Sequence, residues 1–247
     1  MKSLSVSAIG IFLLLAITIA GCKKETSSTL SGNIYGYVDL YDQYGSKILT
    51  SISRTTVTEN GNTVTTDSTG KYTFTNLSAG QYSFSFSRTG FGSINSNALQ
   101  FVGGGNLDHD VKLSAIPNFT DSILNITDTL GNVVLTGTLT GTDTRRRTVA
   151  VFVGSTVATS SNPANYLITY NSLTNNTVNT INSFSIKIPV ADLTDAGFSS
   201  GSTVYFAVYG AAASFASTST YEDLSNTGRS YFTALSPTAV TQSFVLP

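Results

Sequence analysis

Apolar and polar residues alternate along most of the chain, and this pattern predicts β-strands. In residues 33–42 (NIYGYVDLYD), Ile34, Val38 and Leu40 share one face with Gly36. A two-residue period places successive side chains on opposite faces of a strand. We therefore expect a strand whose apolar face is buried and whose other face carries tyrosines.

The aromatic residues concentrate in residues 66–91 (TDSTGKYTFTNLSAGQYSFSFSRTGF). Their alternation with serine and threonine predicts two adjacent strands joined by the turn at 76–80. The inward-facing positions would be Tyr72, Phe74, Tyr82, Phe84 and Phe86. We interpret these aromatic residues as the core of a sandwich and not as its binding surface.

Turn signals separate these strands. The Asn-Gly pair in ENGN (59–62) permits the positive φ angles of a tight hairpin. In DSTG (67–70), Asp67 can accept a hydrogen bond from its own backbone two residues on, and Gly70 can adopt a left-handed conformation. No helical period occurs in this first part of the chain, which is therefore predicted to consist of strands and turns.

The order GYVDLYDQYG, TDSTGKYTFTNLSAGQYSF and DVKL resembles the carboxypeptidase regulatory-like domain. The resemblance covers residues 32–114 and implies a seven-stranded, transthyretin-like β-sandwich. The family has no catalytic residues of its own, so the resemblance implies a scaffold or accessory module. Residues 41–53 (YDQYGSKILTSIS) depart from the pattern, because this segment is longer and more polar than the family's first hairpin.

Alternation resumes after Pro117 and continues to the C-terminus. Turn signals between these segments predict about eight strands and a second sandwich over residues 115–247, of the immunoglobulin or fibronectin type III kind. Residues 190–198 (VADLTDAGF) are the one helix-like piece, with Leu193 and Phe198 available for packing. The predicted fold class is all-β, with two β-sandwiches in tandem.

The N-terminus has the pattern of a targeting signal. Lys2 precedes the largely apolar segment from Leu4 to Ala20, and IAGC (19–22) resembles the lipobox of bacterial lipoproteins. The resemblance implies cleavage after a signal peptide of residues 1–21 and lipidation of Cys22. Residues 22–31 would form the lipidated cysteine and a polar tether.

The residue after Cys22 is Lys23 and not aspartate. In bacterial lipoproteins this favours sorting to the outer membrane. We expect an outer-membrane lipoprotein on the cell surface, with the periplasmic face as the alternative. Its expected partners are the membrane, through the N-terminal lipid, and a glycan or envelope protein.

Composition excludes some classes of function. Charged residues make up 11% of the 247 residues, the formal net charge is −1, and tryptophan is absent. A chain with so little positive charge lacks the electrostatic basis of nucleic-acid binding. The 40% hydrophobic content is high enough for a folded core.

Few residues suggest catalysis. His109 in DHDV is the only histidine and could bind a metal with Asp108 and Asp110, but adjacent strand residues point to opposite faces. We interpret the segment as the polar start of a strand. The carboxylates available to a hydrolase are Glu222, Asp223, Asp192 and Asp195, which we expect in loops and caps. We predict no enzyme, no catalytic residue, no metal and no cofactor.

Two further segments are interpreted as a turn and a loop without a binding role. Gly103–Gly105 predicts a flexible turn, because no phosphate-loop residues follow it. The basic run Arg145–Arg147 could contact lipopolysaccharide phosphates, but a solvated loop is the favoured interpretation.

The candidate ligand-binding residues are tyrosines. Tyr35, Tyr37 and Tyr41 lie on the outward face of the first strand, and Tyr221 lies in the long polar segment 213–228, which we predict to be a loop. Exposed tyrosines offer amphipathic contact area for sugar rings or for a protein. The alternative is that they pack against neighbouring strands or under the second domain.

Together these patterns predict a non-catalytic, lipid-anchored cell-envelope protein with a structural, adhesion or accessory binding role, such as support of an outer-membrane uptake system. Two alternatives stay open. The first is a surface glycan-binding lipoprotein that uses exposed tyrosines, and the second is a hydrolase with an unrecognised carboxylate site.

The lipobox generates a direct test. Cys22→Ala should abolish incorporation of labelled palmitate, because Cys22 is the only cysteine of the chain and its thiol is the predicted acylation site. Labelling of the unaltered protein in the same cells is the control. Continued labelling of the variant would refute lipidation at this position.

Overall fold

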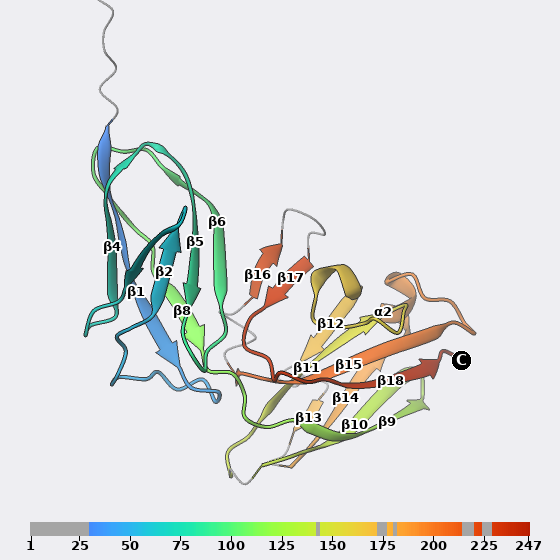
Figure 1. Ribbon diagram of the computed structural model, residues 1–247. Coiled ribbons are helices and arrows are strands. Elements are labelled where there is room, and N and C mark those ends of the chain that lie inside the picture. The colour runs from blue at the N-terminus through green and yellow to red at the C-terminus, as the bar shows by residue number, and fades with distance from the viewer. Residues whose placement is uncertain (1–29, 142–143, 172–176, 180–181, 214–219, 224–228) are drawn as a thin grey trace, which may run out of the picture.

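The structure is a computed structural model (Figure 1) that describes residues 30–141, 144–171, 177–179, 182–213, 220–223 and 229–247. Cys22, the predicted signal peptide and most of the tether lie outside these residues. Within the described residues no helix is long and apolar enough to cross a membrane. The fold is all-β, with two β-sandwiches in tandem.

The first sandwich consists of two sheets. One has the order β4-β1-β7 with β8 also paired to β1, and the other has the order β3-β2-β5-β6. The strands are β1 (Ser31–Tyr41), β2 (Thr56–Glu59), β3 (Asn62–Thr65), β4 (Lys71–Ser78), β5 (Gly80–Ser87), β6 (Ile94–Phe101), β7 (Asn106–Asp108) and β8 (Val111–Ser114).

Strand β1 is central to the first sandwich. It pairs antiparallel with β4 on one side, and parallel with β7 and then β8 on the other. Between β7 and β8 the chain passes directly over Gly36, where an added Cβ would lie 2.1 Å from the His109 carbonyl oxygen. Only glycine allows this close approach, and β7 and β8 are therefore two halves of one interrupted strand position.

The inward face of the first sandwich matches the alternation in the sequence. Ile34, Val38 and Leu40 are at most 1% exposed. The predicted aromatic core is confirmed, since Tyr72 packs edge-on against Phe86 with ring centroids 5.5 Å apart. The other predicted aromatic residues belong to the same cluster, with Tyr82 only half-buried at its edge.

Both predicted turns are confirmed. Asn60 and Gly61 have φ angles of 43° and 86° and join β2 to β3. Asp67 Oδ1 accepts hydrogen bonds from the Thr69 backbone N–H (2.8 Å) and hydroxyl (2.7 Å). These bonds, the hydroxyl bond first, hold the pKa of the Asp67 carboxyl below its usual range.

The second sandwich has two four-stranded sheets in its described part, with the orders β13-β14-β10-β9 and β12-β11-β15-β18. The strands are β9 (Asp121–Thr129), β10 (Asn132–Leu139), β11 (Thr148–Gly154), β12 (Ile168–Asn171), β13 (Thr177–Asn179), β14 (Ser183–Pro189), β15 (Thr203–Ala211) and β18 (Val240–Val245).

Strand β11 is buried along its whole length because apolar groups cover both of its faces. Val149, Val151 and Val153 point into the core between the sheets. On the opposite face, Phe152 packs against Tyr166 with ring centroids 5.2 Å apart. Tyr166 follows a short 3-10 helix (Pro163–Asn165). This second layer explains the continuous apolar run in the sequence.

The predicted helical piece is confirmed as α2 (Val190–Asp195), which buries Leu193. By contrast, the predicted loop 213–228 is not a loop throughout. Thr220–Asp223 forms strand β16, which pairs antiparallel with β17 (Arg229–Phe232). Tyr221 therefore lies in a strand, opposite Tyr231. The hairpin lies beside the second sandwich on the side facing the first (Figure 1).

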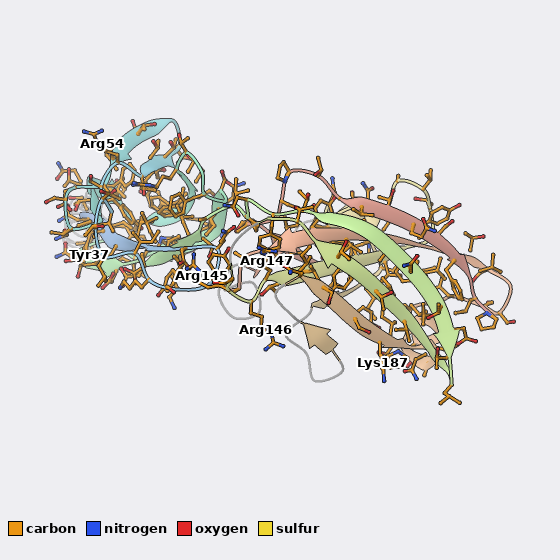
Figure 2. All side chains as sticks on the ribbon, turned by 90° about the horizontal axis from the view of Figure 1, so that it is seen from below. Tyr37, Arg54, Arg145, Arg146, Arg147 and Lys187 are labelled. Atoms are coloured by element: carbon orange, nitrogen blue, oxygen red, sulfur yellow. The ribbon has the colours of Figure 1, made fainter. Side chains whose placement is uncertain are left out.

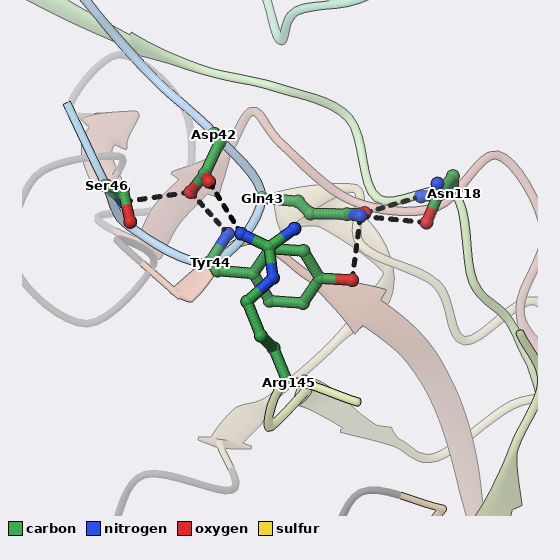
Figure 3. A network of polar contacts seen from close by, with 6 residues as sticks. All are labelled: Asp42, Gln43, Tyr44, Ser46, Asn118 and Arg145. Carbon is green, nitrogen blue, oxygen red and sulfur yellow. Dashed lines mark hydrogen bonds and ion pairs between the residues drawn. The ribbon is translucent and has the colours of Figure 1, made fainter. Parts of the chain in front are cut away.

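The two sandwiches meet at a joint, which we define as the turn after β1 (residues 42–46), Gly92, Asn118, Arg145 and Ala213. Figure 3 shows its polar contacts among Asp42, Gln43, Tyr44, Ser46, Asn118 and Arg145. Gln43 and Asn118 bond reciprocally. Gln43 Nε2 donates to Asn118 Oδ1, and the Asn118 backbone N–H donates to Gln43 Oε1, both at 2.8 Å. The Gln43 carbonyl accepts from the Ala213 N–H at 2.9 Å.

Arg145 of the basic run contacts the joint but stays exposed, so the prediction of a solvated loop is wrong for Arg147 alone. The Arg145 guanidinium lies 3.7 Å from the Tyr44 ring centroid and bonds to Asp42 Oδ2 at 3.1 Å. Arg147 is 1% exposed and lies over Phe119. Arg146 is exposed. Planar guanidinium groups stack well on aromatic faces, which suits arginine to this contact.

The joint generates a steric test. At Gly92 an added Cβ would lie 2.2 Å from the Thr233 carbonyl oxygen. Gly92→Ala should therefore force the sandwiches apart, with a loss of roughly 1–3 kcal/mol in the free energy of unfolding. Small-angle X-ray scattering should show a larger radius of gyration.

Gly105→Ala is the matched control, because nothing lies within 4 Å of the added Cβ. Scattering curves that are identical for the two variants would contradict a close-packed joint at Gly92.

Candidate functional site

The candidate site lies on the outward face of the sheet β4-β1-β7. Tyr35 and Tyr37 project from β1 on the face opposite to the core. Tyr35 pairs with Thr73 of β4 and Asp108 of β7, and Tyr37 pairs with Lys71 of β4. Residues far apart in the sequence therefore gather around both tyrosines. We call this surface the tyrosine face.

Tyr37 is the most accessible aromatic residue of this face. Its side chain is 40% exposed, and its backbone N–H donates to Asp110 Oδ1 at 2.7 Å. In Figure 2, Tyr37 lies at the outer side of the first sandwich, whereas Arg145 and Arg147 lie where the sandwiches meet. The ring is thus presented from a strand that is hydrogen-bonded on both sides.

On one side of Tyr37 is a polar hollow of about 480 Å³. Lys71 Nζ lies 4.9 Å from the centroid of the Tyr35 ring, a distance typical of a cation–π contact. Asn33 Nδ2 donates to Asn106 Oδ1 at 2.9 Å on the floor of the hollow. Besides Tyr37, the hollow is lined by Asn33, Tyr35, Lys71, Thr73, Asn106 and Asp108.

On the other side is an apolar hollow of about 410 Å³. Its aliphatic wall comes from the segment after β1, namely Ile48, Leu49 and Ile52. Its polar rim consists of Asp39, Lys47, Thr69 and Asp110. Tyr37 lines both hollows and forms the ridge between them.

The structure does not bring all predicted tyrosines together. Tyr35 and Tyr37 share the polar hollow, whereas Tyr41 lines neither hollow. Tyr41 lies at the end of β1, where its backbone forms a β-bridge with Lys47 and pairs with Ser114 of β8. Tyr221 belongs to the β16–β17 hairpin of the second sandwich. Ligand binding by these tyrosines stays a prediction.

Sequence reasoning missed the residues that surround the tyrosines. Lys71, Thr73 and Asp108 could have been found from outward positions on the neighbouring strands, had the strand register been known. Leu49 and Ile52 carry no such signal, because they lie in an irregular segment with no period.

His109 lies inside the first sandwich. Its Nδ1 is 3.0 Å from the Tyr72 hydroxyl, which also donates to the His109 carbonyl at 2.6 Å. Its Nε2 is 3.1 Å from Ser96 Oγ. Asp108 and Asp110 are exposed on the opposite side, and no group of three or more potential metal ligands occurs among the described residues. The structure thus agrees with a structural role for this histidine.

Burial lowers the pKa of His109, because desolvation disfavours the imidazolium, and the Asp110 and Asp108 carboxylates oppose this shift only in part. Burial likewise raises the pKa of the Tyr72 hydroxyl. Both groups are therefore neutral near pH 7.

Of the carboxylates considered for hydrolysis, Asp192 has a described hydrogen-bond partner. Asp192 lies in α2, and its Oδ2 accepts a hydrogen bond from the Tyr170 hydroxyl at 3.0 Å. That contact contributes to the raised pKa of Tyr170, after desolvation. Asp195 is exposed at the end of α2. Glu222 and Asp223 lie in β16.

Comparison with protein families supports the resemblance for part of the chain. Residues 50–114 match the model of the carboxypeptidase regulatory-like domain. The match includes the segment from β2 to β8 and excludes β1. The boundaries 32–114 and 115–247 stay predictions. No match was found among curated proteins.

Similar solved structures are distant. A "putative carbohydrate binding protein" from Bacteroides uniformis is 17% identical, with a TM-score of 0.32, and the match covers 86% of this chain and 98% of that one. A DUF3823 family protein from Parabacteroides merdae is 12% identical, with a TM-score of 0.31 and coverages of 89% and 100%.

The major pilin subunit BcpA of Bacillus cereus is 11% identical, with a TM-score of 0.28 and coverages of 83% and 69%. At these TM-scores none of the similarities supports an inference about function.

The buried histidine generates a test of pH dependence. The unfolded chain should bind a proton at His109 with a pKa of about 6.5, and the folded chain only at lower pH. The free energy of unfolding should therefore fall as the pH falls below about 6.5, because the unfolded state then binds more protons.

His109→Gln removes this titration. Urea unfolding at about pH 7.5 and about pH 5 should show a smaller loss of stability in the variant than in the unaltered protein. Carboxylates titrate in both proteins, so their contribution cancels in the comparison. An equal loss of stability in the two proteins would contradict a lowered pKa of His109.

Proposed function

We propose that the chain is a non-catalytic, lipid-anchored envelope protein that binds a glycan on the tyrosine face of its first sandwich. The observation that carries the proposal is Tyr37, an exposed aromatic ring between two hollows on a hydrogen-bonded sheet. The structural and adhesion roles predicted from the sequence are compatible with such a module.

A strand-held ring is suited to binding because little conformational freedom is lost. The main chain at Tyr37 is fixed by β4 and by the Asp110 carboxylate. Preorganised aromatic groups lower the entropic cost of association. A rigid, flat ring can stack on the apolar face of a pyranose ring.

The surroundings of the ring supply polar partners. Asn33, Lys71, Thr73, Asn106 and Asp108 offer amide, ammonium, hydroxyl and carboxylate groups within one hollow. Sugars carry both donors and acceptors at their edges, so a mixed set of this kind suits them better than a set of a single sign.

The location at the outer membrane is part of the proposal, and it is supported by the sequence of the lipobox and by Lys23. The cell surface is the preferred side, because extracellular glycans are available there, and the periplasmic face is the alternative. In a lipid-anchored chain the tether would enter the first sandwich at the Ser31 end of β1. The joint to the second sandwich follows the Tyr41 end of the same strand.

A structural role is the second candidate, and the joint favours it. The reciprocal bonds of Gln43 and Asn118 and the stacking of Arg145 on Tyr44 connect the sandwiches directly. A connection of this kind suits an accessory protein that holds a partner of an outer-membrane uptake or adhesion system at a set distance.

Glycan binding is tested with the full chain in detergent on a polysaccharide array. Tyr37→Ala should weaken each hit by roughly tenfold, a loss of about 1.4 kcal/mol that is typical of truncating an aromatic contact residue. Affinities from titration calorimetry would measure the effect.

Leu130→Ala is the control, because Leu130 is 96% exposed in the turn between β9 and β10 of the second sandwich. An array without any hit would end the glycan proposal and leave the structural role.

A further inference from the structure

We propose that the tyrosine face selects N-acetylated sugars, with the acetamido group in the apolar hollow beside Tyr37. The proposal rests on glycan binding by this face and names its substrate class. It follows from three properties of the apolar hollow: an aliphatic wall, a fixed position and a polar rim that matches an amide.

The wall consists of branched aliphatic side chains. Leu49 is 78% exposed, and Ile48 and Ile52 are half-buried and pack against the core of the first sandwich. A single exposed leucine is ordinary on a protein surface. Here, however, Leu49, Ile48 and Ile52 line one hollow together with Tyr37.

The segment that carries the wall is held in place. The Ile48 N–H donates to the Leu40 carbonyl at 2.8 Å, and the backbones of Lys47 and Tyr41 form an isolated antiparallel β-bridge. Further along, the Arg88 guanidinium donates to the carbonyls of Ser51 and Ser53. The hollow is therefore formed before a ligand arrives, which lowers the cost of binding.

A glycan without apolar substituents would gain less from this wall than one that carries a methyl group. Hydroxyl groups placed against Leu49 and Ile52 would lose their hydrogen bonds to water and find no partner there. A methyl group would gain from the same position, because its apolar surface leaves water. The acetyl methyl group of an acetamido sugar lies at the right place, since it branches from a ring that can stack on Tyr37.

The rim of the hollow completes the match. An acetamido group has one N–H donor and one carbonyl acceptor. Asp110 accepts the Tyr37 N–H at 2.7 Å and, as a carboxylate, has capacity for another donor. The Lys47 ammonium bonds to Asp39 at 2.8 Å and has further protons for a carbonyl oxygen. Both residues line the hollow.

The geometry thus assigns one sugar ring to Tyr37, its acetamido group to the apolar hollow and the adjoining sugar of the chain to the polar hollow. The apolar hollow is lined by Asp39, Asp110 and Lys47, and the polar hollow by Asp108 and Lys71, so the site has no surplus of positive charge. The site therefore suits a neutral acetylated glycan better than an acidic one.

The test compares three soluble probes on the full chain in detergent: a hexamer of β-1,4-linked N-acetylglucosamine, its deacetylated form and a cellulose hexamer. The acetylated probe should bind about tenfold more tightly than the cellulose probe, because its methyl group is buried and its acetamido group forms hydrogen bonds. Leu49→Ser should remove this preference and leave the affinity for the cellulose probe unchanged.

Leu130→Ser is the matched control, since it makes the same substitution at another exposed leucine, outside the site. Leu49 is largely exposed, so its substitution should leave the thermal unfolding midpoint unchanged. Leu49→Met, which keeps an apolar wall, should retain the preference for the acetylated probe.

The outcomes are distinguishable. Equal affinity for the acetylated and cellulose probes, or tighter binding of the deacetylated probe, would overturn the acetamido assignment and leave glycan binding in place. Binding of none of the probes, together with an empty polysaccharide array, would overturn both. A protein ligand whose binding alone is weakened by Leu49→Ser would overturn the assignment and give the hollow to a protein partner.

Discussion

The hydrogen-bonded position of β1 is the constraint on which the first sandwich depends. Because β1 is paired on both sides, its alternate residues are committed to opposite faces for its whole length. Ile34, Val38 and Leu40 build the core, and Tyr35 and Tyr37 are therefore obliged to face outward. A shift of one residue in register would bury the tyrosines and expose the core.

The same strand connects the candidate site to the joint. The turn that follows β1 supplies Asp42, Gln43 and Tyr44 to the contact with the second sandwich. A few residues later it supplies Ile48 and Leu49 to the apolar hollow. One irregular segment thus contributes both to the joint and to the apolar hollow.

Alternation in the sequence was sufficient to predict most strands, the inward-facing aromatic residues and the fold class, because burial on one face imposes a two-residue period. The helix-like segment 190–198, which lacks this period, was also predicted, and α2 buries Leu193 as expected. Alternation failed at Thr220–Asp223, a polar segment that pairs with β17 in a two-stranded sheet separate from the two larger sheets of the second sandwich.

The candidate site was predictable only in part. Tyr35 and Tyr37 follow from the outward face of β1, but their partners depend on strand register and on the path of residues 42–53. The burial of Arg147 was not predictable either. A guanidinium is normally solvated, and the contact of Arg147 with the ring of Phe119 depends on the tertiary fold, which the sequence pattern does not reveal.

The segment from residue 42 to residue 53 has a consequence for how the protein can vary. Surface loops usually tolerate insertions, since the entropy of loop closure grows slowly with length. Here the first part of the segment is bonded across the joint, and its end is bonded by Arg88. Added residues would be accommodated only around Leu49 and Thr50, where they would reshape the wall of the hollow. Changes of loop length in this protein would therefore change the shape of the apolar hollow and leave the joint intact.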